Sequence, residues 1–272
     1  MGEREYGLYQ AATEHSACGV GFITRKDGAQ THDVIALGEQ ALCAIPHRGG
    51  MSAEGVGDGA GVSIDLSVDY FSALAGRPLE RGHFGVGNFF MPDDPTQWDR
   101  ARGLIVTALA EAGLATLVVR EVPVDDAVLR ARALRYQLPI VQWVFQLAEP
   151  GDADDQRGRI DWAANTALLA IEAEAYTDPA LTGLYPLSLS ARTQVLKGRL
   201  NAGEVIGYFT DLRDPAQKVR SLYFHTRFST NTEPHPTMAQ PFRLMAHNGE
   251  LNTDRKNRIA DHTVAQARGK VI

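Results

Sequence analysis

The order of apolar segments is the feature that most constrains the fold of this chain. Runs of strand length follow one another directly in several places, as LYPLSLS and TQVLKG do within 184–198. Helices are expected over 33–45, over 94–114, in a long segment that ends near Tyr176, and in the final polar stretch. A parallel, doubly wound sheet would need a more regular alternation of strand and helix. We therefore expect an α+β architecture of stacked antiparallel sheets with helices outside.

The expected elements follow from apolar spacing and from helix-capping signals. The expected strands are CGVGFITR (18–25), GVSIDL (61–66), HFGVGNFFM (83–91), ATLVVREV (115–122), PIVQWVFQLA (139–148), LYPLSLS, TQVLKG, SLYFHTRFS and FRLMAHNG. The core-facing residues expected in the first helix are Val34, Leu37, Ala41 and Ile45, and those in the long helix are Ile160, Ala164, Leu168, Ile171 and Ala175. Asp94 is the expected N-cap of the helix over 94–114.

Composition excludes several classes of protein. With 44% hydrophobic and 22% charged residues, the 272-residue chain resembles an ordinary soluble globular protein. A net charge of −6 argues against a nucleic-acid or anionic-membrane partner, and no apolar run approaches the roughly 18 residues of a membrane span. The N-terminus lacks the apolar core of a secretory signal. Two cysteines outside any CxxC pattern fit a reducing cytoplasm and predict no disulfide framework and no zinc site.

Four segments stand out from this ordinary background. They are CGVGF from Cys18, PHRGG with GDGAG over 46–61, HTRFSTNTEPHP over 225–236, and AHNGELNT over 246–253. They combine the residue types that chemistry needs, namely a thiol, arginines, a side-chain amide and glycines that let the backbone come close to a ligand. The GDGAG loop does not follow an expected strand, so it fails the test for a dinucleotide-binding fingerprint.

Each segment taken alone also has a purely structural interpretation. Cysteine is among the most buried residue types, so Cys18 could be core filler, and Cys43 on its helix is expected to be buried and inert. The loop over 47–61 could be a simple flexible turn, because glycine supplies positive φ angles. Arg227 could sit on a solvated strand edge. The pair Asn248-Gly249 is typical of a tight hairpin.

Together and in this order, the four segments resemble the glutamine amidotransferase domain that opens the large subunit of glutamate synthase. The similarity covers residues 18 to about 258 and includes SLSARTQVLKG at 188–198. RFSTNT with AHNGELNT is a specific combination, whereas Cys–Gly with HRG would fit any class II amidotransferase. The resemblance implies an N-terminal nucleophile (Ntn) hydrolase fold, a four-layer αββα sandwich of two stacked antiparallel sheets.

The resemblance makes Cys18 the nucleophile and the first residue of the mature chain. In an Ntn enzyme the free α-amine of that residue is the general base for its own side chain. An α-amine has a pKa of about 7.7–8.0 and a thiol one of about 8.5, so proton exchange between them is nearly balanced. While the Ala17–Cys18 peptide bond is intact, this nitrogen is an amide and cannot act as a base. Residues 1–17 are therefore expected to be a leader that is removed.

The same resemblance assigns groups to the substrate. The side-chain amide of Asn248 and the backbone N–H of Gly249 are expected to stabilise the oxyanion of the tetrahedral intermediate. Arg227 is expected to hold the α-carboxylate of glutamine, because a planar guanidinium matches two carboxylate oxygens.

Further residues are expected to shape the pocket. Thr230 and Asn231, with the following threonine, form the expected wall beside the substrate. Arg48 either orders the HRG loop beside the nucleophile or contacts the substrate. The loop over 47–61 is expected to act as a lid. His225, His235 and His247 are interpreted as packing or hydrogen-bonding residues.

One expected element is missing from the sequence. The family grips the α-amino group of glutamine with an aspartate in a GSDS-like motif, and no such motif occurs before Ile272. Asp254 and Asp261 are the nearest acids, but neither has that context. The amidotransferase domain over 18–272 is therefore expected to be incomplete at its C-terminus.

The expected function is the glutaminase part of glutamate synthase, which releases ammonia for channelling to 2-oxoglutarate. FMN and an iron–sulfur cluster are expected in the rest of the parent enzyme, whose FMN-binding synthase domains or subunit would receive the ammonia, and no cofactor is expected in this chain. Two alternatives stay open. The chain could be a stand-alone amidotransferase subunit of a related synthase, or a non-catalytic scaffold or glutamine sensor that retains its leader.

Overall fold

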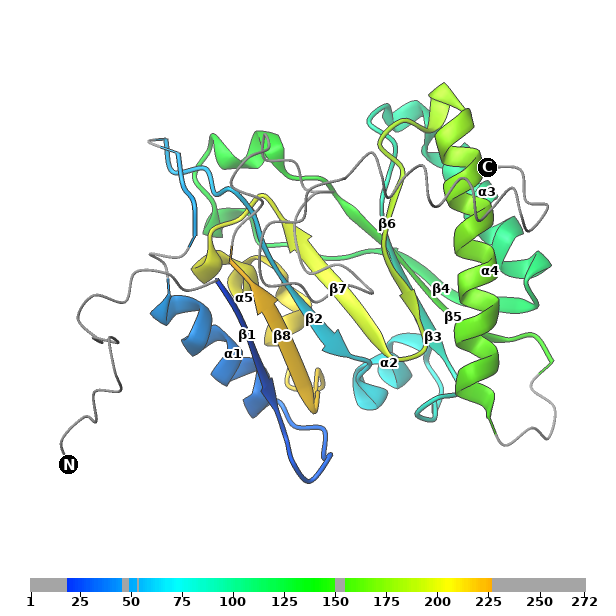
Figure 1. Ribbon diagram of the computed structural model, residues 1–272, viewed down its shortest axis with the longest axis horizontal. Coiled ribbons are helices and arrows are strands. Elements are labelled where there is room, and N and C mark those ends of the chain that lie inside the picture. Colours follow the sequence, from blue (N-terminus) through cyan, green and yellow to red (C-terminus); the bar gives the residue numbers. More distant parts are fainter. Residues whose placement is uncertain (1–18, 46–48, 53, 150–154, 227–272) are drawn as a thin grey trace, which may run out of the picture.

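The computed structural model describes residues 19–45, 49–52, 54–149 and 155–226 (Figure 1). Within these residues the strands form two four-stranded antiparallel sheets. The first sheet has the order β1-β8-β2-β7 and the second the order β4-β5-β3-β6. The strands are β1 (Val20–Thr24), β2 (Ala60–Asp65), β3 (Gly85–Phe90), β4 (Leu114–Glu121), β5 (Ile140–Leu147), β6 (Tyr185–Ser190), β7 (Thr193–Gly198) and β8 (Ser221–His225).

Five α-helices pack against these sheets within the described part of the chain. They are α1 (Asp33–Ala44), α2 (Val68–Ala75), α3 (Trp98–Glu111), α4 (Gln156–Thr177) and α5 (Val205–Tyr208). The α+β sandwich of two antiparallel sheets predicted from the sequence is confirmed. The elements over 33–45, 94–114 and 156–176 are helical as predicted, and Asp94 accepts a hydrogen bond from the N–H of Thr96 where the second of them begins.

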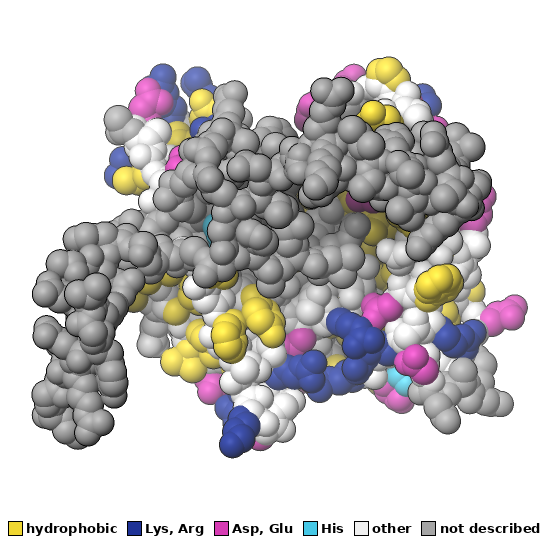
Figure 2. Space-filling view, viewed as in Figure 1, with side chains coloured by type: hydrophobic (Ala, Val, Ile, Leu, Met, Phe, Trp, Pro, Cys, Tyr) yellow, Lys and Arg dark blue, Asp and Glu magenta, His cyan; other side chains and the backbone are white. Residues whose placement is uncertain are grey.

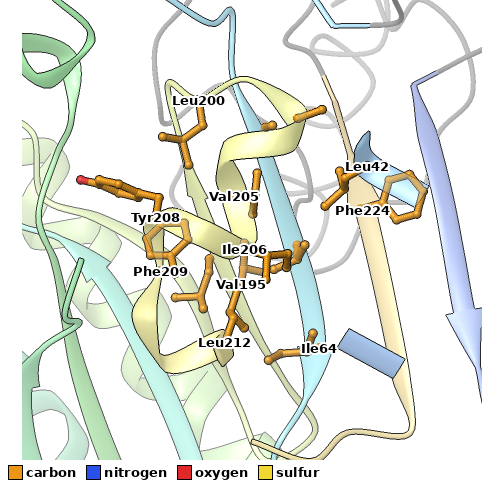
Figure 3. Packing of buried hydrophobic residues seen from close by; sticks show 14 of the residues in the cluster. Leu42, Ile64, Val195, Leu200, Val205, Ile206, Tyr208, Phe209, Leu212 and Phe224 are labelled. Atoms are coloured by element: carbon orange, nitrogen blue, oxygen red, sulfur yellow. The ribbon is translucent and has the colours of Figure 1, made fainter. Parts of the chain in front are cut away.

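The first sheet packs with α1 and α5 around one apolar cluster. Leu42 of α1, Ile64 of β2, Val205 of α5 and Phe224 of β8 belong to it and are buried (Figure 3). α5 contributes buried side chains all along its length, so this short helix is held by tertiary packing rather than by its own propensity.

The second sheet carries α3 and α4 on one face. Trp143 of β5 and Phe89 of β3 meet edge to face at 5.3 Å and are fully buried beneath these helices. On α4 the residues Ile160, Ala164, Leu168 and Ile171 are buried, as the sequence spacing predicted.

The apolar face of α1 differs from the predicted one. Its buried residues are Val34, Ile35, Gly38 and Leu42, whereas Leu37 is 46% exposed. The buried stripe is therefore rotated toward Ile35 and Leu42. Cys43 follows Leu42 and leaves that stripe, so the prediction that Cys43 is buried was wrong, and this cysteine is free and exposed.

Buried amide side chains join the two sheets. Gln142 of β5 donates to Asn88 Oδ1 of β3 at 2.9 Å and to Gln194 Oε1 of β7 at 3.0 Å. Asn88 Nδ2 in turn donates to the carbonyl oxygen of Val195 at 2.9 Å. Arg120 of β4 donates to Gln142 Oε1 at 2.8 Å, and all three amide side chains are at most 1% exposed. Each of these three amide side chains has a hydrogen-bond partner, so the network holds the sheets in one alignment.

Candidate active site

The structure does not describe the residues predicted to carry the chemistry. Cys18, Arg48, Arg227, Thr230, Asn231, Asn248 and Gly249 all lie outside the described residues, as do residues 1–17. The described residues do include direct chain neighbours of three of them, Gly19, Gly49 and Thr226.

Two motif neighbourhoods meet at one end of the first sheet. The backbone N–H of Thr226 donates to the carbonyl oxygen of Gly19 at 2.7 Å. The next rung pairs Val20 with His225, and His225 also lies opposite Gly61 of β2. We call this the Gly19 end of the first sheet, defined by Gly19, Thr226 and Gly61. Thr226 is 1% exposed, and its Oγ1 is buried without a hydrogen-bond partner among the described residues.

The glycine-rich loop also reaches the Gly19 end, because it leads directly into β2. Its described residues on either side of position 53 pair as the two arms of a hairpin, in which Met51 pairs with Gly57 and the N–H of Asp58 donates to the carbonyl oxygen of Gly50 at 2.8 Å. We call this the hairpin over 50–58. Met51 on its first arm is 60% exposed, whereas Val56 on its second arm is buried.

One arm of this hairpin packs tightly against the segment after β7. A Cβ atom at Gly57 would lie 2.3 Å from the carbonyl carbon of Leu200, so only glycine fits there. Asn201 Nδ2 donates to the carbonyl oxygen of Gly55 at 3.4 Å, and Glu54 forms an ion pair with Arg132. The arm that enters β2 is therefore anchored. The role of the loop as a lid stays a prediction.

Sequence reasoning missed Lys197 at the same end of the sheet. Lys197 of β7 lies opposite Gly61 and is 1% exposed. Its ammonium group lies 5.2 Å from the centre of the Tyr185 ring. Burial lowers the pKa of Lys197 to about 7. The available signal was a single lysine near the end of the apolar strand TQVLKG, because a charged residue in a buried strand places its side chain in or beside the core.

Among the described residues, no group of three or more His, Cys, Asp or Glu side chains is arranged to hold a metal ion. No helix in the described ranges has the length and apolar character that a membrane crossing needs.

Comparison with known proteins identifies the class. The family model for class-II glutamine amidotransferases matches residues 18–269, a range that contains all four motifs. The chain therefore belongs to the class-II glutamine amidotransferases. This confirms the resemblance drawn from the motifs, and the two antiparallel sheets are consistent with the Ntn-hydrolase fold of that family.

Among characterised proteins, the chain is similar to glutamate synthases. It is 35% identical over 256 residues to ferredoxin-dependent glutamate synthase 1 of Arabidopsis thaliana, covering 92% of this chain and 16% of the relative. It is 34% identical over 262 residues to the NADH glutamate synthase of Saccharomyces cerevisiae, covering 93% of this chain and 12% of the relative. It is 32% identical over 254 residues to the NADPH glutamate synthase large chain of Bacillus subtilis, covering 92% and 16%. The chain thus spans only a small part of the length of these relatives.

Proposed function

We propose that Cys18, freed by removal of residues 1–17, hydrolyses the side-chain amide of glutamine. The observation that carries the proposal is the family match, which begins at Cys18 and spans every motif. The hydrogen bond between Gly19 and Thr226 supports it, because Cys18 and Arg227 are covalently bonded to these two residues. Consecutive Cα atoms lie only about 3.8 Å apart. The motif of the nucleophile and the motif of the carboxylate-binding arginine therefore both pass close to this hydrogen bond.

The reaction consists of two acyl-transfer steps. The α-amine of Cys18 takes the thiol proton, and the thiolate forms a bond to the amide carbon of glutamine. The tetrahedral intermediate collapses when the C–N bond breaks, and the α-ammonium gives its proton to the departing nitrogen, which leaves as ammonia. Water then attacks the γ-glutamyl thioester, with the amine again accepting the proton, and releases glutamate and the thiol.

Five other residues of the proposed site act on the substrate. The side-chain amide of Asn248 and the N–H of Gly249 stabilise the oxyanion in both steps. Arg227 binds the α-carboxylate of glutamine through a bidentate pair of hydrogen bonds. Thr230 and Asn231 form the adjacent wall of the pocket.

Arg48 belongs to the proposed site through the loop that follows it. The anchored hairpin over 50–58 begins two residues after Arg48, which supports a role for this arginine in ordering the loop beside the nucleophile.

The wider reaction is proposed from the relatives. The released ammonia passes to the synthase part of a glutamate synthase, where 2-oxoglutarate is converted to glutamate in the cytoplasm. The FMN and the iron–sulfur cluster of that synthase belong to segments outside this chain, and the synthase domains are its proposed partners. The names of the relatives, which are ferredoxin-dependent, NADH and NADPH glutamate synthases, support this assignment.

A pair of cysteine variants tests the nucleophile. Cys18→Ala is expected to abolish glutamine hydrolysis while the fold is kept. Cys43→Ser is the matched control, because Cys43 is the only other cysteine and is free and exposed. In the Cys43→Ser background, iodoacetamide should modify one thiol per chain and stop hydrolysis, and glutamine should protect against this. Glutaminase activity in Cys18→Ala would overturn the assignment.

Intact-mass measurement of active protein tests the maturation step. The expected mass is that of a chain beginning at Cys18. Active protein that retains Met1 would contradict the α-amine mechanism. Inactive protein that retains Met1 and binds glutamine would favour the alternative of a glutamine sensor.

A further inference from the structure

Four arginines from separate segments line one small pocket at the far end of the first sheet. Arg81 comes from the connection between α2 and β3, and Arg157 from the first turn of α4. Arg192 precedes β7 and Arg220 precedes β8. A group of Lys and Arg side chains lies at the lower centre of Figure 2, where Figure 1 places the ends of β2 and β6. We call this site the arginine pocket.

The arginine pocket is remote from the Gly19 end. Asp65, which lines it, is the last residue of β2, whereas Gly61 lies near the beginning of that strand. Four residues of strand span about 13 Å. The arginine pocket therefore does not belong to the proposed glutaminase site, and a proposal about it stands or falls independently.

The positive charge of the pocket is only partly neutralised. Among the described residues that line it, Asp65 is the only acid. Asp161, outside the lining, pairs with Arg192 at 2.6 Å. Four guanidinium groups against two carboxylates leave an excess of two positive charges on these side chains.

Asp65 has little hydrogen-bonding capacity left for the arginines. Its Oδ1 accepts the backbone N–H groups of Arg220 and Ser221, each at 2.8 Å, and its Oδ2 accepts Gln30 Nε2 at 2.7 Å. Arg81 and Arg220 lie 3.8 Å and 3.9 Å from Oδ2, beyond hydrogen-bonding distance. Asp65 is a buried anchor for the strand ends and leaves the guanidinium donors available.

Arg157 adds an unsatisfied buried donor. Its Nε is buried and has no hydrogen-bond partner among the described residues. A buried N–H without an acceptor costs free energy, and an acceptor that enters the pocket would recover it. The pocket has a volume of about 40 Å³. A single water needs roughly 10–15 Å³ by this measure, so the space suits one small polyatomic group and not a nucleotide.

We propose that the arginine pocket binds a small oxyanion of the carboxylate or phosphate class. Planar guanidinium groups donate pairs of hydrogen bonds that match the oxygens of these anions, and spherical chloride offers no such match. Arg81 and Arg220, which are 39% and 46% exposed in their side chains, contact the anion from the solvent side.

Calorimetric titration of the 272-residue chain tests this site. The probes are sodium phosphate and, separately, sodium succinate, a dicarboxylate without the amino group that glutamine carries. Both are titrated at constant ionic strength set with sodium chloride. We expect saturable binding of at least one probe, and the comparison of the two shows which oxyanion is preferred. The double variant Arg81→Gln/Arg220→Gln should weaken binding by about tenfold or more, as expected when charge-assisted hydrogen bonds are lost.

Arg102→Gln is the matched control. The Arg102 side chain is also 39% exposed and also lies 3.8 Å from carboxylate oxygens, but on α3. It should leave the dissociation constant unchanged. Thermal unfolding checks that each variant is folded, and the single variant Arg81→Gln replaces the double one if that fails to fold. The proposal is overturned if neither probe binds below about 10 mM, or if the arginine variants bind as tightly as the control.

Discussion

The N–H of Thr226 bonds to the carbonyl oxygen of Gly19 over 2.7 Å, and this bond extends the pairing of β1 with β8 by one rung. It fixes the beginning of one motif beside the beginning of another that is far away in the sequence. Gly19 and Thr226 are held in place by the backbone hydrogen bonds of the sheet and not by their side chains. The proposed nucleophile and the proposed carboxylate ligand thus depend on backbone pairing of β1 and β8.

The first prediction concerns Arg227. Replacing it with lysine should raise the KM for glutamine by about tenfold or more and change kcat little, because lysine keeps the charge but loses the bidentate geometry. Steady-state glutaminase kinetics measure both constants, with Arg102→Lys as the control. An unchanged KM would show that another group holds the α-carboxylate.

Two glycine variants test the anchoring of the hairpin over 50–58. Gly57→Ala should destabilise the protein by about 1–3 kcal/mol and lower glutaminase activity, because the added methyl group meets the Leu200 backbone. Gly103→Ala should instead stabilise by about 0.5–1 kcal/mol, since Gly103 lies within α3 and nothing lies within 4 Å of its Cβ position. Urea denaturation measures both changes. Equal effects of the two variants would contradict the close contact at Gly57.

The buried amide network predicts a cost for losing Gln142. In Gln142→Leu, the buried Asn88 Oδ1 loses its donor, and Arg120 loses one acceptor although it keeps its ion pair with Asp211. The expected loss of unfolding free energy is about 1–3 kcal/mol. Gln97→Leu replaces a half-buried amide before α3 that donates to Thr96 beside it, and it should change stability by less than about 0.5 kcal/mol. A neutral Gln142→Leu would mean that leucine packing compensates for the network.

Lys197 predicts a pH dependence of stability. Its pKa in the folded state is about 7, below the ordinary value of 10.5, so between these pH values the unfolded chain binds the proton and the folded chain does not. The free energy of unfolding therefore rises with pH in this window, by at most about 1.4 kcal/mol per pH unit from this group. Lys197→Met should lack this rise. Between pH 7.5 and pH 9 the wild type should therefore gain unfolding free energy relative to the variant.

Urea denaturation at both pH values tests the Lys197 prediction. Lys218→Met, which removes an exposed lysine paired with Asp69, controls for the loss of a positive charge. Parallel pH profiles of wild type and Lys197→Met would contradict the lowered pKa.

Local patterns predicted most of the secondary structure. Each strand-length run from CGVGFITR to SLYFHTRFS contains a strand in the described part of the chain, and the long helix buries the predicted face. The helix α2 was missed because it is only eight residues long, although Ser67 caps its start and Gly76, with a φ of 65°, ends it. The buried stripe of α1 was misplaced because both candidate stripes are apolar, and packing on the first sheet selects one of them.

The parts of the site that depend on register could not be predicted. Nothing near Lys197 in the sequence shows that β7 pairs with β2, so its position opposite Gly61 requires the fold. The arginine pocket has the same origin, because its four arginines come from three connections and the first turn of α4. The motifs themselves were informative because each is short and chemically unusual.

The amide ladder through Asn88, Gln142 and Gln194 has a consequence for how the sandwich assembles. A one-residue slip in the pairing register of β3, β5 or β7 would turn the amide of that strand to the opposite face and leave an apolar side chain facing buried donors. Such misaligned intermediates lack compensating bonds, so few compact alternatives compete with the native arrangement. Buried polar side chains thus specify the strand register of this protein, which apolar contacts alone would not do.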